Sequence, residues 1–102
     1  MRGGMPNMQK LMKQAQQMQK EMETARKEIN ETEFVGKSAS DLVVATFTGD
    51  NKLKDLQIKA DVIDPEDPDM LQDLIVDAVN HGLAQISEAT EQKMGKYTKG
   101  LM

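Results

Sequence analysis

The chain of 102 residues contains no cysteine and no tryptophan, and its aromatic side chains are two phenylalanines and one tyrosine. Without cysteine it can form neither disulfides nor thiolate metal sites, which fits a reducing compartment. With so few aromatic residues, a hydrophobic core has to consist of Leu, Ile, Val and Met. A chain of this length can bury such a core within a single unit, so we expect one domain that spans residues 1–102.

Long apolar runs are missing as well. No stretch approaches the ~20 apolar residues of a membrane helix. The amino-terminal sequence MRGGMPNMQK also lacks the apolar segment of a signal peptide. We therefore expect a cytoplasmic protein that has no membrane partner.

Acidic and basic residues are unevenly distributed along the chain, although the net charge is only −4. The first 20 residues contain one Arg and three Lys but no acid, and residues 93–102 contain three Lys and no acid. Between Lys37 and Gln92 the acids strongly outnumber the lysines. Such segregation is often only a solvated surface, but it is also typical of a basic arm attached to an acidic body.

Residues 8–32 are predicted to form a long helix that follows a flexible start at residues 1–7. Apolar residues recur there with a heptad spacing, at a positions (Met8, Ala15, Met22, Ile29) and d positions (Leu11, Met18, Ala25). Such a narrow stripe, here called the seam, is not stable alone in water and requires a partner helix, either from this chain or from a second copy. The seam is ~33 Å long, comparable to a small domain, so we expect this helix to project as an arm.

The face of this helix opposite the seam is basic. Lys13, Lys20 and Lys27 occupy f positions, with Lys10 beside them at c. Lysines at f positions occur in any soluble coiled coil, so this pattern alone does not identify a binding site. The lack of acids in residues 1–20, together with the second basic end of the chain, favours contacts with the phosphates of duplex nucleic acid.

Residues 33–60 show the pattern of a small antiparallel sheet. Three runs alternate in hydrophobicity or are rich in Val and Thr: Glu33–Lys37, Leu42–Thr48 and Leu53–Ala60. The sequence Gly-Asp-Asn-Lys at 49–52 is a strong hairpin signal between the last two. A three-stranded meander with one apolar face is therefore expected.

A second long helix is predicted over residues 64–94. Asp64-Pro65-Glu66-Asp67 reads as a cap with acids in the first turn, and Pro68 offers an alternative start. Its broad apolar face is suited to lie on a sheet and comprises Leu71, Leu74, Ile75, Ala78, Val79, Gly82, Ile86 and Ala89. Gly95 is a predicted stop, followed by a loose basic tail at 95–102. The predicted fold is α+β in the order α-β-β-β-α, with two long helices flanking the sheet.

Catalysis is poorly supported by the sequence. His81 is the only histidine, and its position four residues after Asp77 predicts an ordinary surface pair. The acids between Asp61 and Asp69 lack the spacing of a calcium loop, and capping explains most of them. We expect no enzymatic activity, no cofactor, no metal and no small-molecule substrate.

Four motifs together resemble the YbaB/EbfC nucleoid-associated proteins of bacteria along nearly the whole chain. They are residues 2–5 (RGGM), 12–19 (MKQAQQMQ), 64–67 (DPED) followed by 70–75 (MLQDLI), and 93–101 (KMGKYTKGL). The resemblance implies the α-β-β-β-α fold and a tight homodimer whose helices project like tweezers. It also implies binding of duplex DNA, a role in nucleoid organisation or gene regulation, and no enzymatic activity.

The leading hypothesis is a homodimer in the cytoplasm and nucleoid that binds duplex DNA mainly through backbone charge. The alternative is a coiled-coil dimer that scaffolds a protein partner and touches no nucleic acid. The predicted DNA contacts are the basic residues of both ends of the chain: Arg2, Lys10, Lys13, Lys20, Lys27, Lys93, Lys96 and Lys99.

Overall fold

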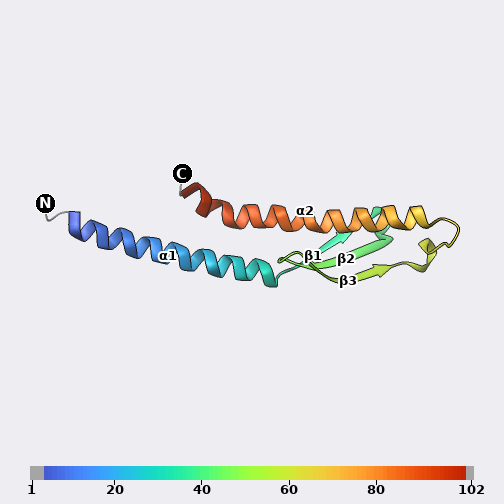
Figure 1. Ribbon diagram of the computed structural model, residues 1–102, viewed down its shortest axis with the longest axis horizontal. Coiled ribbons are helices and arrows are strands. Elements are labelled where there is room, and N and C mark those ends of the chain that lie inside the picture. The colour runs from blue at the N-terminus through green and yellow to red at the C-terminus, as the bar shows by residue number, and fades with distance from the viewer. Residues whose placement is uncertain (1–3, 101–102) are drawn as a thin grey trace.

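The computed structural model describes the backbone of residues 4–100 and the side chains of residues 7–97. Its main elements are, in order, α1 (Gly4–Glu31), β1 (Glu33–Lys37), β2 (Val43–Thr48), β3 (Lys52–Ile58) and α2 (Pro68–Gly100). Short 3-10 turns follow β1 and β3, at Ala39–Asp41 and Ala60–Val62. The Cα atoms extend over 79 × 21 × 16 Å, so the molecule is a rod (Figure 1). The predicted α+β class and element order are confirmed.

The sheet is an antiparallel meander in the order β1-β2-β3. The turn between β2 and β3 closes where the N–H of Asn51 donates to the carbonyl of Thr48 at 3.0 Å. Asn51 has φ 67°, a left-handed conformation that Asn tolerates in turns. A bulge next to this turn brings Phe47 opposite Leu53. Bulges of this kind twist an edge strand and make it a poorer template for pairing with another chain.

The core lies between the sheet and α2, which packs over β1 and β2 (Figure 1). It is formed by alternate residues of β2 and by the predicted apolar face of α2, and its buried members are Val43, Ala45, Phe47, Ala78 and Ile86. Strand and helix approach most closely at Gly36. A Cβ atom built on Gly36 would lie 2.1 Å from the carbonyl oxygen of Ala78, so only glycine fits this crossing.

The seam of α1 is divided into a covered half and an open half. Ala25 and Ile29 are buried, because α2 runs beside this end of α1 and supplies the partner helix within the same chain (Figure 1). Met8 and Leu11 keep 61% and 63% of their surface exposed, because α1 extends beyond the end of α2. The predicted arm is therefore present, and its outer half has no partner among the described residues. Among all the residues that the structure describes, neither long helix is apolar enough to cross a bilayer.

The ends of both helices differ from the prediction. α1 already begins at Gly4, so the expected flexible start at 1–7 is wrong for residues 4–7; residues 1–3 lie outside the described chain. α2 begins at Pro68 and not at residue 64, because Oδ1 of Asp67 caps it by accepting the N–H of Met70 at 3.3 Å.

The carboxyl-terminal end of α2 also corrects the prediction. The helix continues through Gly95 to Gly100, so the predicted stop and the loose tail at 95–102 are wrong as far as Gly100. The physical reason is packing, because Tyr97 is buried and thereby holds the turns after Gly95 in place. The third strand is shorter than expected and ends at Ile58, where the chain turns into the 3-10 segment Ala60–Val62.

Candidate nucleic-acid interface

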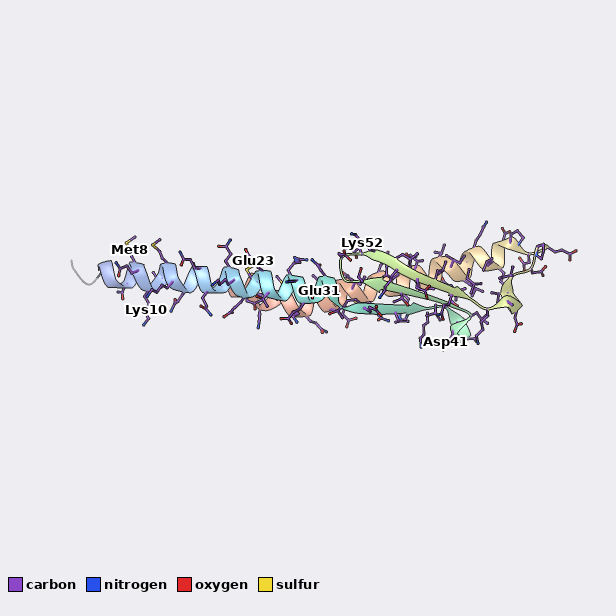
Figure 2. The ribbon with its side chains drawn as sticks, turned by 90° about the horizontal axis from the view of Figure 1, so that it is seen from below. Met8, Lys10, Glu23, Glu31, Asp41 and Lys52 are labelled. Atoms are coloured by element: carbon purple, nitrogen blue, oxygen red, sulfur yellow. The ribbon has the colours of Figure 1, made fainter. Side chains whose placement is uncertain are left out.

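The arm carries a row of exposed lysines. Lys10, Lys13, Lys20 and Lys27 are all exposed on α1. Figure 2 shows Lys10 and Met8 projecting from opposite sides of the arm. The ion pairs among the described residues are Lys37–Asp41, Lys52–Asp50, Lys54–Glu33 and Lys93–Glu28. None of them involves a lysine of the arm, whose positive charges are therefore available to an external anion.

Lysines from both long helices meet in a groove between α1 and α2. The groove has a volume of about 590 Å³, and its charged and aromatic lining is Lys20, Glu21 and Glu28 from α1 with Lys93, Lys96 and Tyr97 from α2. The two helices contribute these side chains from positions more than 70 residues apart in sequence. The structure thus brings together three of the lysines that the sequence assigned to two separate basic ends.

The two lysines from α2 are held differently in this groove. Nζ of Lys93 donates to Oε2 of Glu28 at 2.7 Å, which joins α2 to α1. Nζ of Lys96 lies 5.0 Å from the centroid of the Tyr97 ring, within the range of a cation–π contact. Lys93 is thus partly neutralised within the chain, whereas Lys96 remains a free positive charge beside an aromatic ring.

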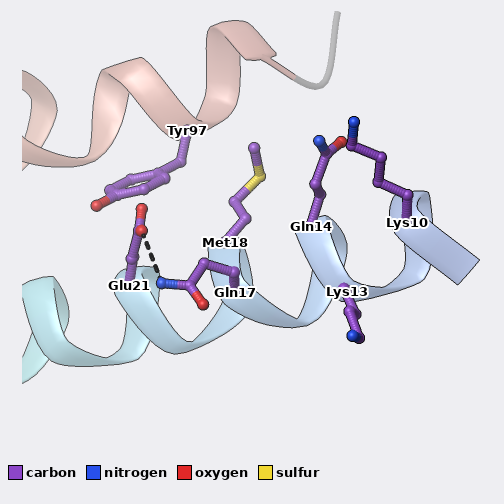
Figure 3. Close-up of a pocket in the computed structure, with 7 residues that line it drawn as sticks. All are labelled: Lys10, Lys13, Gln14, Gln17, Met18, Glu21 and Tyr97. Carbon is purple, nitrogen blue, oxygen red and sulfur yellow. Dashed lines mark hydrogen bonds between the residues drawn. The ribbon is translucent and has the colours of Figure 1, made fainter.

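A second hollow, of about 550 Å³, lies next to this groove toward the tip of the arm (Figure 3). Its lining consists of Lys10, Lys13, Gln14, Gln17, Met18, Glu21 and Tyr97. In Figure 3 Tyr97 points from α2 toward Glu21 on α1, while Lys13 points away on the far side of the arm. Tyr97 lines both hollows, so the same aromatic side chain borders lysines of both long helices.

The remaining predicted contacts are placed elsewhere or lie outside the described residues. Lys27 lines a separate hollow together with Arg26, a basic residue that the list of predicted contacts missed because it flanks the seam. Arg2 lies outside the described residues, and so does the side chain of Lys99.

The features considered for catalysis have structural roles. Nδ1 of His81 accepts the backbone N–H of Lys37 at 2.9 Å, and its Nε2 lies 3.0 Å from Nε2 of Gln85. The predicted surface pair of His81 with Asp77 is therefore replaced by a link to the edge strand β1. Oδ1 of Asp64 accepts the N–H of Glu66 at 2.9 Å, as expected of a turn. Within the described chain, no group of three His, Asp or Glu side chains is arranged to hold a metal ion.

Two shifted titratable groups lie on or beside the sheet and not on the arm. The hydroxyl of Thr48 donates a hydrogen bond to Asp50 and lowers the pKa of that carboxyl. A hydrogen bond to Glu33 raises the pKa of Lys54. The first hydrogen bond lies at the turn after β2, and the second joins β3 to β1.

Comparison with known proteins decides the family. The sequence profile of the YbaB/EbfC DNA-binding family matches residues 5–101. The chain belongs to this family. The match covers both long helices and the sheet, and so includes the groove between α1 and α2 in full.

Similar family members include proteins of lactic acid bacteria. A nucleoid-associated protein of Lactobacillus acidophilus is 66% identical over 98% of this chain and 89% of its own length. One from Lactococcus lactis is 62% identical over 95% of this chain and 98% of its own. Among solved structures, an uncharacterized protein of Helicobacter pylori is 25% identical and superposes with a TM-score of 0.72 over 86% of this chain and 92% of that one. The α-β-β-β-α fold is therefore shared with a distant protein.

Proposed function

We propose that this protein binds duplex DNA as a homodimer in the cytoplasm and nucleoid, and that the lysines of its arm contact the phosphate backbone. The observation that carries this proposal is the exposed lysine row of α1, which makes no ion pair among the described residues and adjoins the groove of Lys20, Lys93 and Lys96. Family membership supports it, since relatives are described as nucleoid-associated proteins. The proposed role is binding and not catalysis.

Contacts of this type act mainly through charge. Lysine is a flexible point charge, and phosphate contacts position a protein on DNA without reading its sequence. The only aromatic ring in the basic region belongs to Tyr97, which is buried and so cannot serve as a platform for unpaired bases. We therefore expect binding to duplexes of unrelated sequence with similar affinity.

The homodimer is supported by apolar surface that one copy leaves open. Met8 and Leu11 on the outer seam are exposed, and so are Leu53 and Ile63 on the body. Exposed patches of this kind commonly mark protein interfaces. We expect a mass of about 23 kDa in sedimentation, twice the 11.4 kDa of one chain. A monomer at micromolar concentration would contradict this part of the proposal.

A gel shift at low salt with a short duplex tests DNA binding. The expected result is retardation of the duplex by the wild type and weaker retardation after Lys13, Lys20 and Lys27 are replaced by Gln. A protein of net charge −4 without a basic arm should not retard DNA at all. The same exposed seam also suits the alternative function, a coiled-coil scaffold for a protein partner. That alternative predicts no retardation under any salt condition.

A further inference from the structure

Tyr97 is the contact that closes the carboxyl-terminal end of α2 onto the arm. It retains only 7% of its surface exposed, although it lies three residues from the end of the helix. Figure 3 shows its ring directed from α2 toward α1, next to Glu21 and Met18. Among the described residues its hydroxyl makes no hydrogen bond, so the contact depends on the ring.

The turn that Tyr97 anchors is the one that carries the basic residues of α2. Lys93 precedes Tyr97 by four positions and therefore lies on the same helical face. Lys96 is its direct neighbour and lies over the ring. With the ring seated on α1, both lysines border the groove to which α1 contributes Lys20.

Two neighbouring features contribute little to holding this turn in place. Gly95 lies within the helix two residues before Tyr97, and a Cβ atom added there would meet nothing within 4 Å. Glycine disfavours helix relative to alanine, and the last turns of a helix fray when they lack a tertiary contact. The Lys93–Glu28 ion pair is exposed, and exposed pairs contribute little. The Tyr97 ring is thus a buried attachment of this turn to the arm, in contrast to the exposed ion pair.

We propose that Tyr97 is a positioning residue for DNA binding, which holds Lys93 and Lys96 beside Lys20 so that the three lysines form one phosphate-binding patch. This proposal rests on the proposed function, and it assigns Tyr97 no contact with DNA. It predicts that loss of the ring weakens binding through the lysines of α2, while the fold of the body stays intact.

The main test compares the salt dependence of duplex binding for the wild type, Tyr97→Ala and Tyr97→Phe. Each phosphate contact contributes about 0.9 to the slope of log affinity against log salt. Tyr97→Ala should flatten the slope by about 2, because Lys93 and Lys96 leave the patch. Tyr97→Phe keeps the ring and should retain the wild-type slope. Gly95→Ala, which favours the helix without a clash, is a matched control that should also retain it.

A second comparison shows whether Tyr97 acts through the two lysines. In a chain with Lys93→Gln and Lys96→Gln, adding Tyr97→Ala should cause no further loss of slope, because residues that act as a unit are not additive. An additive loss would overturn the proposal. So would a wild-type slope in Tyr97→Ala.

A readout without DNA tests the seating of the ring. The chain has one tyrosine and no tryptophan, so its intrinsic fluorescence comes from Tyr97 alone. The wild type should resist quenching by acrylamide more strongly than a Tyr97-containing peptide of residues 90–102, and equal quenching would overturn the proposal. If the ring proves protected but the wild type binds no duplex, the proposed function fails and this inference fails with it. If the wild type binds with a steep slope that Tyr97→Ala leaves unchanged, only this inference fails.

Discussion

Nζ of Lys93 donates a hydrogen bond to Oε2 of Glu28 at 2.7 Å, and this pair joins two residues that are 65 positions apart in the sequence. The carboxylate of Glu28 occupies the place that a phosphate oxygen would take on this lysine. Glu28 is therefore an internal competitor of DNA at one of the basic residues of the groove.

Replacing Glu28 by Gln should strengthen DNA binding, because it releases Lys93 for a phosphate. The slope of log affinity against log salt should stay near its wild-type value, because Lys93 contacts a phosphate in both proteins. The pair is exposed, so the free energy of unfolding should change by less than about 1 kcal/mol. Fluorescence anisotropy with a labelled duplex measures both the affinity and the slope, and an affinity equal to that of the wild type would show that Glu28 does not compete with DNA for Lys93.

Replacing Lys13, Lys20 and Lys27 by Gln should flatten the same slope by about 2 to 3. The dimer would carry six of these lysines, and we expect about half of them to reach one duplex at a time. Folding should be almost unaffected, since all three are exposed and Gln is a good helix former.

The matched control for this change has the same loss of charge on the body of the protein. Lys37, Lys52 and Lys59 are also exposed, but they lie on or beside the sheet. Their replacement by Gln should leave most of the slope intact. If the slope of log affinity against log salt fell by the same amount in both triple variants, net charge and not the arm would govern binding.

Gly36→Ala should destabilise the fold. The added Cβ would lie 2.1 Å from the carbonyl oxygen of Ala78 and 2.3 Å from the backbone N of Gly82, and these backbone atoms cannot move without shifting α2. Overpacking of this type costs about 1–3 kcal/mol. Urea denaturation measures the loss, and Gly95→Ala is the contrasting case because its Cβ meets open space. Equal stabilities of the two variants would contradict the close crossing of β1 and α2.

Local patterns were sufficient to predict most of the fold. The alternation of Val43, Ala45 and Phe47 identified the buried face of β2, and the spacing of Ala78 and Ile86 identified the face of α2 that covers it. These predictions succeeded because each residue's burial follows from the period of its own element. The end of α2 was predicted wrongly at Gly95, because the helix is continued by a contact of Tyr97 with α1, almost 80 residues earlier in the sequence.

The candidate site was only partly accessible from the sequence. The lysine row of α1 follows from heptad positions, since Lys13, Lys20 and Lys27 repeat every seven residues. No local pattern shows that Lys93 and Lys96 lie beside Lys20, because their proximity depends on the pairing of α1 with α2. For the same reason, the sequence could not show that one half of the seam is covered by the chain itself.

The response of duplex affinity to salt tests most directly whether the protein binds through the phosphate backbone. The decisive measurement is the affinity of the wild type for three duplexes of unrelated sequence over a range of salt concentrations. We expect log affinity to fall linearly with log salt, with a steep slope that is the same for all three duplexes. A flat dependence, or tight binding to one duplex alone, would contradict binding through the phosphate backbone.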